Sequence, residues 1–331
     1  MTNIFTLFFS LLFEAIPFLL LGIIVSSLLL VFASNRLISA RLPNHPLLGA
    51  IVGSCLGLIL PVCEYGNIPV ARRMLLQKVP TPIVIGFLIG APTINPLTIW
   101  VTWIAFSDRL EIVILRVVLV LIVAAIVGWV FHAQPDPDSL LRRWLKLPQH
   151  QPNVASSTAI WQQQRRDLLH SGTFLVSPHQ THQPNVAIST TKYTLFGRLS
   201  LVLDNIVLEL RQLGIFLVCG CAIAAILQVI IPRAQLLNLG VGSISAVVVM
   251  MLLGMLVSTS SILDAFFIRA FTSSFSSGAL LAYLVFGAIA DWKSISLIFS
   301  IFRPRVALYL LLLVAQLTFL LTSFINLKIS Y

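Results

Sequence analysis

The stretch IVILRVVLVLIVAAIVGWVF, Ile112–Phe131, holds a single charged residue, Arg116, among twenty. An α-helix rises 1.5 Å per residue, so twenty residues reach about 30 Å, the thickness of the hydrocarbon core of a bilayer. The first apolar run, Ile4–Ala33, is longer and spans with tilt or with a kink at Pro17. A signal peptide is the alternative for this run, but the run is too long and lacks a basic start. Both stretches therefore predict transmembrane helices.

The composition agrees with a membrane protein. Of 331 residues, 58% are hydrophobic and 10% are charged, and the mean hydropathy is +0.99. Soluble domains average about 25% charged residues, so this composition excludes an ordinary soluble enzyme. The net charge of +10 would suggest nucleic acid in a soluble protein, but the basic residues here lie between apolar runs, where they meet lipid headgroups. We expect a lipid bilayer as partner and no nucleic acid.

The apolar runs predict an all-α, polytopic integral membrane protein with about eight transmembrane helices in two repeated four-helix halves that contain broken helices. A re-entrant piece in each half would change this count and would invert the repeats, which the sequence leaves open. The further runs, with possible extensions to 76 and 301, are Leu47–Leu60, Ile83–Phe106, Ile206–Ile231, Ile244–Leu263, Gly278–Ile289 and Val306–Ile325. The first transmembrane repeat is 1–132 and the second is 204–331.

The segment between the halves, 133–203, has no long apolar run and contains a near-duplicate, HQPNVA at 150 and at 182. Such a segment cannot bury enough apolar surface to fold alone, so it predicts a flexible polar linker. Its histidines have no regular metal-ligand spacing. With the N-terminus inside and eight crossings, thirteen basic residues fall on the inner side and eight, Arg116 and Lys293 among them, on the outer side. This count favours a cytoplasmic linker in a multi-pass protein of the plasma membrane.

The two halves resemble copies of one unit. Aligning Cys63 with Ser260 places Asn67 on Asp264, an offset of 197 residues. Asn95 aligns with Asp291 at an offset of 196. The segment FLLLG at 18 aligns with FLVCG at 216, an offset of 198. Duplicated halves are common in secondary transporters, whose substrate site lies at the repeat interface near the bilayer midplane.

Polar residues inside apolar runs are the candidates for function, because their burial in lipid is costly. The candidates for the substrate or ion pathway, with Glu14 beside them, are Cys63, Glu64, Asn67, Pro92, Asn95, Ser260, Ser261, Asp264 and Asp291. Pro61, Pro69, Pro92 and Pro96 break helices around them and free carbonyl groups that can coordinate an ion or a polar solute. The alternatives are helix packing for Glu14, a solvated helix end for Glu64 and simple kinks at the prolines.

Cysteine and basic residues give weaker signals. Cys63 beside Glu64 offers one soft ligand, and Cys219-Gly220-Cys221 is one residue shorter than the usual redox spacing. Arg72 and Arg73 follow the first motif as inner-surface anchors or as an electropositive mouth for an anion. No pattern calls for a catalytic residue, a bound metal or an organic cofactor.

The motifs resemble those of a predicted bacterial permease family that includes the organoarsenical efflux permeases. The family's P-x-C-x-x-G-x-x-P and FL-x-x-x-P-x-x-N-P motifs match Pro61–Pro69 and Phe87–Pro96. In its second half the family has a Cys-Ser pair, a following Asp-Ala and then Gly-x-x-x-Asp. Residues 260–265 and 287–291 of this chain are similar to that pattern. This chain has Glu64-Tyr65 and Ser260 where family members often carry further cysteines. The resemblance implies a permease, and the departures argue against a three-thiol arsenical site.

The sequence thus predicts a permease, not an enzyme, that moves a small solute or ion by alternating access. Asp264 and Asp291 would accept protons or cations, and Asn67 and Asn95 would supply neutral hydrogen bonds. Two alternatives remain: a membrane thiol-redox protein acting through Cys63 and the Cys219/Cys221 pair, and a non-transporting membrane subunit of a complex. The protein is also a possible homo-oligomer.

Overall fold

The computed structural model describes residues 2–32, 43, 45–60, 62–133, 140–141, 195–231, 242–257 and 260–329. These residues form twelve α-helices, which confirms the all-α class. Most of the predicted linker lies outside the described residues, as does Pro61, and α10 begins at Leu195, inside the range assigned to the linker.

Within the described ranges, four helices are long and apolar enough to cross a membrane. They are α1 (Thr2–Phe32), α7 (Leu110–His132), α10 (Leu195–Ile230) and α16 (Pro304–Ile329). A helix satisfies its own backbone hydrogen bonds, which is what a segment in hydrocarbon requires. Pro17 lies inside α1 and does not end it.

The other predicted runs, with the residues that follow them, form short helices. In the first half these are α3 (Pro46–Ile59), α4 (Asn67–Leu76), α5 (Thr81–Gly90) and α6 (Pro96–Ala105). In the second half they are α12 (Ser243–Val257), α13 (Asp264–Arg269), α14 (Ser277–Phe286) and α15 (Trp292–Ile301). Ten residues reach about 15 Å, half of the thickness of the hydrocarbon core, so a ten-residue helix does not cross it alone. The prediction of broken helices is confirmed.

Glycines let α3 and α5 lie against each other over their whole length. A Cβ atom on Gly86 would collide with the carbonyl oxygen of Ala50, and one on Gly90 would collide with Ser54. Toward the end of both helices, Gly57 meets Ala91 in the same way. Contacts that advance together along both helices mean that α3 and α5 run in the same direction. The chain therefore returns in α4, which lies between them in the sequence. This stripe of small residues is the usual way for membrane helices to approach closely.

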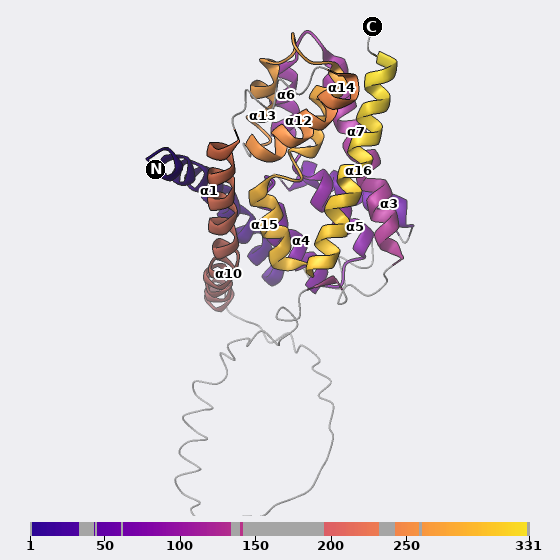
Figure 1. Cartoon of the computed structure of the whole chain (residues 1–331). Coiled ribbons are helices and arrows are strands. Elements are labelled where there is room, and N and C mark those ends of the chain that lie inside the picture. Colours follow the sequence, from indigo (N-terminus) through magenta and orange to yellow (C-terminus); the bar gives the residue numbers. More distant parts are fainter. Residues whose placement is uncertain are drawn as a thin grey trace, which may run out of the picture.

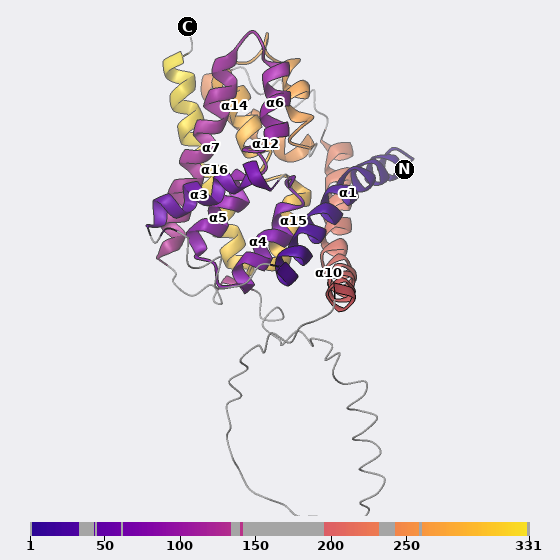
Figure 2. The ribbon, with the colours of Figure 1, turned by 180° about the vertical axis from the view of Figure 1, so that it is seen from behind.

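The short helices gather at two opposite ends of the molecule (Figure 1). α4 and α15 pack together at the end where α7 ends and α10 begins, called the linker end below, and α6 and α13 pack together at the other end. Helices α7 and α16 lie next to each other along one side. Seen from behind, α1 and α10 form a separate pair at the opposite side, where α1 packs on α4 and α10 packs on α15 (Figure 2).

Candidate functional site

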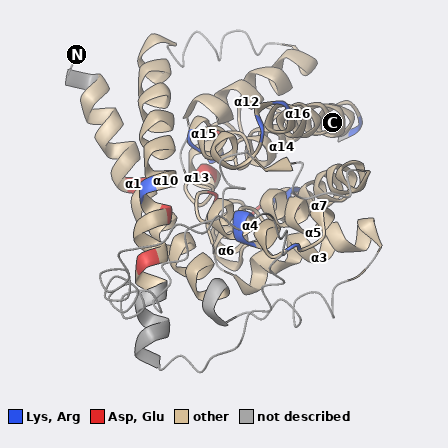
Figure 3. Ribbon diagram, turned by 90° about the horizontal axis from the view of Figure 1, so that it is seen from below, with Lys and Arg blue, Asp and Glu red and all other residues tan. Residues whose placement is uncertain are grey.

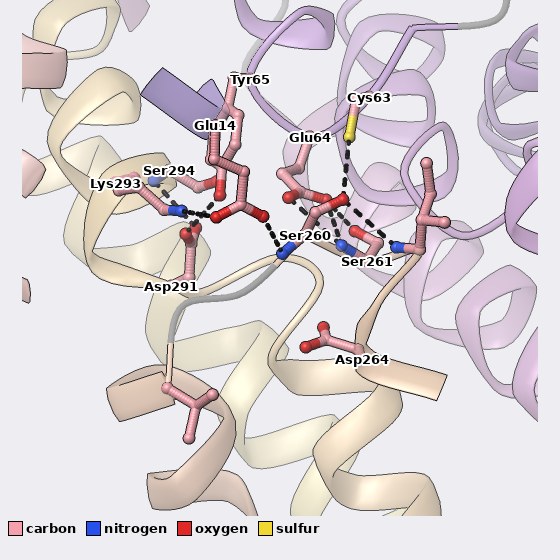
Figure 4. Close-up of polar contacts among 12 residues, drawn as sticks. Glu14, Cys63, Glu64, Tyr65, Ser260, Ser261, Asp264, Asp291, Lys293 and Ser294 are labelled. Carbon is pink, nitrogen blue, oxygen red and sulfur yellow. Dashed lines mark hydrogen bonds and ion pairs between the residues drawn. The ribbon is translucent and has the colours of Figure 1, made fainter. Parts of the chain in front are cut away.

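Two broken segments meet at the centre of the molecule, the turn 62–66 before α4 and residues 260–263 before α13 (Figure 4). The Sγ atom of Cys63 lies 4.0 Å from Oγ of Ser260. The carboxylate of Glu64 accepts hydrogen bonds from both the backbone N–H, at 3.0 Å, and the hydroxyl of Ser261. Both contacts join residues 197 positions apart, so residues that the sequence aligns with each other are also partners in space.

The aligned acidic and amide residues stand at helix N-termini. Asn67 and Asp264 are the first residues of α4 and α13. Asn95 accepts a hydrogen bond from the N–H of Leu97 at 3.0 Å and caps α6, and Asp291 accepts one from the N–H of Ser294 at 2.9 Å and caps α15. Caps of this kind satisfy amide groups that the helix itself leaves unpaired.

Two tyrosines hold the aspartates from the side. The hydroxyl of Tyr283 donates to Asp264 at 3.0 Å, and that of Tyr65 donates to Asp291 at 3.2 Å. Both tyrosine side chains are completely buried. Each aspartate is therefore fixed in place and is positioned at the interior of the protein, as the cost of charge in lipid demands.

The structure places the predicted pathway residues together. Those buried around the two segments are Cys63, Glu64, Asn67, Asn95, Ser260, Ser261, Asp264 and Asp291. The amide of Asn95 donates to the carbonyl of Val62 at 3.5 Å, which ties the α5–α6 break to the first turn. Glu14 of α1 reaches the same centre and accepts from the N–H of Ser260 at 3.1 Å, so helix packing is not its whole role.

Two cations that the sequence analysis assigned to the outer surface lie buried in this cluster. Lys293 has no exposed surface; its Nζ lies 4.0 Å from Oε2 of Glu14 and 4.8 Å from the ring centre of Tyr65. Arg116 is 1% exposed and donates to Oγ1 of Thr102 at 2.6 Å and to the carbonyl of Ser261 at 3.4 Å. The surface assignment was wrong because the carboxylates that attract both cations come from distant parts of the chain. The signal was present in Arg116, a charge in the middle of an apolar run.

Arg72 and Arg73 are buried as well and do not form an exposed inner surface. Seen from below, the basic residues of α4 lie among the helices rather than at the rim (Figure 3). Arg72 donates to Gln212 of α10 at 2.8 Å, and Arg73 donates to Asn205 at 3.2 Å and lies 3.8 Å from Glu209. They connect α4 to α10.

A small cavity opens beside Glu64, between the two halves. It is lined by Glu64, Asn67, Ile68, Leu88, Pro92, Ala288, Ile289, Ser294 and Ile298. Three of these residues, Glu64, Asn67 and Pro92, are predicted pathway residues. The turns that follow α5 and α14 supply Pro92, Ala288 and Ile289, so both helix breaks border the same space.

The four cysteines are free thiols, and Cys63 is the one that belongs to the central cluster. Cys219 is exposed and Cys221 is buried on α10. Among the described residues, no group of three or more His, Cys, Asp or Glu side chains has the arrangement of a metal site.

Comparison with known proteins places the chain among permeases. The model of a family described as "Predicted permease" (ArsP_1) matches residues 1–327. The UPF0718 protein YcgR of Bacillus subtilis strain 168 is 32% identical over 300 residues, which cover 91% of this chain and 89% of that protein. A Streptococcus mutans protein, named as a candidate subunit of a two-component membrane permease complex, is 27% identical over 90% of this chain and 87% of its own length. No solved structure matches the chain significantly.

Proposed function

The chain belongs to this family of permeases, and on that premise we propose that it moves a small solute or ion across the bacterial plasma membrane as a secondary transporter. The observation that carries the proposal is the central cluster: carboxylate and amide side chains from both halves meet at helix breaks in the interior. Such breaks border binding sites in transporters because the freed backbone groups and helix ends need polar partners. Membership of a permease family implies a transporter rather than an enzyme.

The two halves are inverted repeats in this proposal. The order of long and short helices from α1 to α7 is the order from α10 to α16. α4 lies at the linker end and its counterpart α13 at the other end, while α6 and α15 are exchanged in the same way. A two-fold axis in the membrane plane produces this exchange, and residues on the axis contact their own counterparts, as Glu64 contacts Ser261.

Each half then crosses the membrane three times. α3 and α4 form a re-entrant hairpin, α5 and α6 together make one crossing, and α1 and α7 make the others. The same holds for α12 and α13, for α14 with α15, and for α10 and α16. An odd number of crossings per half inverts the second half relative to the first.

Basic residues support an orientation for this topology. The linker end receives the Lys and Arg residues that the chain carries after α1, between α4 and α5, between α7 and α10, and after α15. The other end receives Arg109, Arg233, Arg269 and Lys328. The excess at the linker end makes that end cytoplasmic, in keeping with the predicted linker, and places the N-terminus outside instead of inside.

Transport proceeds by alternating access between the two ends. The helix pair α1/α10 covers α4 and α15 at the cytoplasmic end, whereas α1 with α6 and α10 with α13 make no comparable contact among the described residues. A two-fold symmetric molecule has a second, equivalent arrangement in which the pair covers the other end. The solute passes through the central cluster between these two states.

A growth screen tests the function without assuming a substrate. A strain that lacks the protein is grown with metals, metalloids and amphipathic toxicants, and the wild type and the variants Asp264→Asn and Asp291→Asn are returned to it. We expect wild type to change tolerance to one class and both variants to lose the change. Asp204→Asn, at an exposed carboxylate of α10, is the matched control. If the strain with the Asp291→Asn variant tolerates the toxicant as the strain with wild type does, the proposed pathway is contradicted.

The name of the Streptococcus mutans relative favours a second candidate, the membrane subunit of a two-component complex. In that case the isolated chain would not transport. Purification of a tagged chain from its own host distinguishes the two: a stoichiometric partner, together with no flux by the isolated chain in proteoliposomes, supports the complex.

A further inference from the structure

We propose that the cavity beside Glu64 binds one small monovalent cation, with oxygen ligands from Glu64, Asn67 and Ser294. The inference rests on the proposed permease function and adds a coupling ion to it, at a place distinct from the two aspartates. It stands on three observations: polar atoms without partners at the cavity, the charge of its lining, and its size.

Two buried oxygen atoms of cavity-lining residues have no hydrogen-bond partner among the described residues. They are Oδ1 of Asn67, on a residue that is 2% exposed, and Oγ of Ser294, also on a residue that is 2% exposed. An unpaired buried polar atom costs about 1–3 kcal/mol, so native proteins rarely keep one without a partner. The two residues come from opposite halves and line the same small cavity.

The orientation of Asn67 is fixed, which settles which atom is unpaired. Its Nδ2 donates to the carbonyl of Leu88 at 2.9 Å. A carbonyl oxygen can only accept, so the amide nitrogen must face Leu88 and Oδ1 must point elsewhere. An amide oxygen held in this way is a ligand for a cation or an acceptor for a hydrogen-bond donor. It cannot bind an anion.

The cavity lining has one formal charge. Glu64 is the acidic residue in it, no Lys or Arg side chain lines it, and the other walls are apolar apart from Asn67 and Ser294. The N–H and hydroxyl of Ser261 hold the carboxylate from the side of the second half. Around this cavity the carboxylates of Glu14, Glu64, Asp264 and Asp291 outnumber the two buried cations, Lys293 and Arg116. One bound monovalent cation reduces this excess of negative charge, which a buried site in lipid favours.

Ligand number and space exclude the other ion classes. Ca²⁺ takes six to eight oxygen ligands, usually with several carboxylates, and Mg²⁺ keeps several waters in an octahedral shell. The cavity has room for about one water molecule and offers a single carboxylate, so it has too few ligands for Ca²⁺, no space for the waters of Mg²⁺, and no space for an organic solute. A dehydrated Na⁺ or Li⁺ fits both the charge and the space.

Binding of radioactive Na⁺ to the purified full-length protein in lipid nanodiscs tests the site. We expect saturable binding by wild type. Ser294→Ala removes one ligand and should weaken Na⁺ binding by about tenfold or more. The variant keeps the backbone N–H of residue 294, which donates to Asp291, the N-cap of α15. Glu64→Gln removes the charge and should abolish binding. Ser300→Ala, at a fully buried serine of the same helix away from the cavity, should leave binding unchanged.

Two outcomes overturn the cation site. One is the absence of saturable Na⁺ or Li⁺ binding by wild type; the other is unchanged affinity in a Ser294→Ala variant that elutes and unfolds like wild type. The growth screen separates either result from the wider proposal. If Asp291 still controls tolerance while no cation binds, the site is wrong and the permease stands.

Discussion

At the scale of single residues, the feature that governs this protein is charge in its interior. Four carboxylates reach the central cluster, from Glu14, Glu64, Asp264 and Asp291, together with the two cations Lys293 and Arg116. A buried charge is tolerated when partners of opposite sign and hydrogen bonds replace the lost water. The cations are therefore part of the same arrangement as the carboxylates and should not be exchangeable for neutral residues.

Replacement of Arg116 tests this. Arg116→Gln removes a buried cation that interacts with Asp264 and Glu64, and loss of one partner from a buried charge pair costs about 3–5 kcal/mol. Arg116→Lys should recover little, because one ammonium group cannot reach both Thr102 and the carbonyl of Ser261 as the guanidinium fork does. Thermal unfolding in detergent measures both variants, and Arg109→Gln, at an exposed arginine, is the control. If Arg116→Gln unfolds at the same temperature as wild type, the buried cation is not needed for stability.

Residues differ in how well the sequence predicts them. Asp264 and Asp291 could be found because a carboxylate in an apolar run is costly and because each aligns with an asparagine. Arg116 and Lys293 were misplaced, since a basic residue in or near an apolar run can equally be an anchor at the membrane surface. Tyr65 and Tyr283 gave no signal, because a tyrosine in an apolar segment resembles ordinary packing until its hydroxyl is seen to meet an aspartate.

At the scale of elements, hydropathy predicts the apolar runs and the breaks but not the direction of the chain after a break. In the proposed topology the run that begins at Leu47 turns back after α3, whereas the run Ile83–Phe106 continues from α5 into α6. Both contain prolines beside polar residues, so the sequence alone does not distinguish a hairpin from a kinked crossing. The packing of α3 on α5 makes this distinction. Because these two helices run side by side in the same direction, the chain that joins them has to return in α4.

Gly53 should be the most sensitive position of the stripe of small residues between α3 and α5. Gly53→Val places a side chain on the backbone of Ile83, and separation of two packed helices costs about 3 kcal/mol or more. We expect little folded protein in fluorescence-detected size-exclusion chromatography. Gly214→Ala is the matched control, because a Cβ atom there meets nothing within 4 Å. If both variants elute alike, close contact between α3 and α5 is not needed for folding.

The contact between α6 and α13 includes an exposed ion pair with a defined pH dependence. Asp108, which follows α6, accepts from Arg269 of α13 at 2.5 Å, and this hydrogen bond holds the pKa of the Asp108 carboxyl below its usual range. A lowered pKa in the folded state means that the pair stabilises above the usual Asp value of about 3.9 and is lost as the pH falls through the lower value.

Asp108→Asn should therefore lower the unfolding temperature by a small, constant amount from pH 8 to pH 5, by analogy with other exposed ion pairs. The difference from wild type should shrink below about pH 4, where the carboxyl of the unfolded wild-type chain begins to take up its proton, and vanish below the lower pKa of the folded state. Differential scanning fluorimetry over this range measures it. A difference that grows on acidification would contradict the sign.

At the scale of the whole molecule, the helices α3–α7 and α12–α16 follow the proposed two-fold symmetry, and the pair α1/α10 departs from it. The departure identifies contacts that must exchange between the two states. The sequence offsets make Gln212 the counterpart of Glu14 and Arg269 the counterpart of Arg72. Arg72 donates to Gln212 here, so its symmetric equivalent, Arg269 with Glu14, should form when the pair covers the other end.

That exchange predicts two cross-links that exclude each other. In a cysteine-free background, Arg72→Cys with Gln212→Cys should cross-link the state seen here, and Glu14→Cys with Arg269→Cys should cross-link the second state. In this structure Arg269 instead pairs with Asp108, and Glu14 contacts Ser260, so the second link requires a large movement of α1. Each link should abolish flux, and reduction should restore it, provided that the cysteine-free parent transports. If only the first pair ever cross-links in transporting protein, the helix pair does not move between the ends and the halves do not exchange conformations.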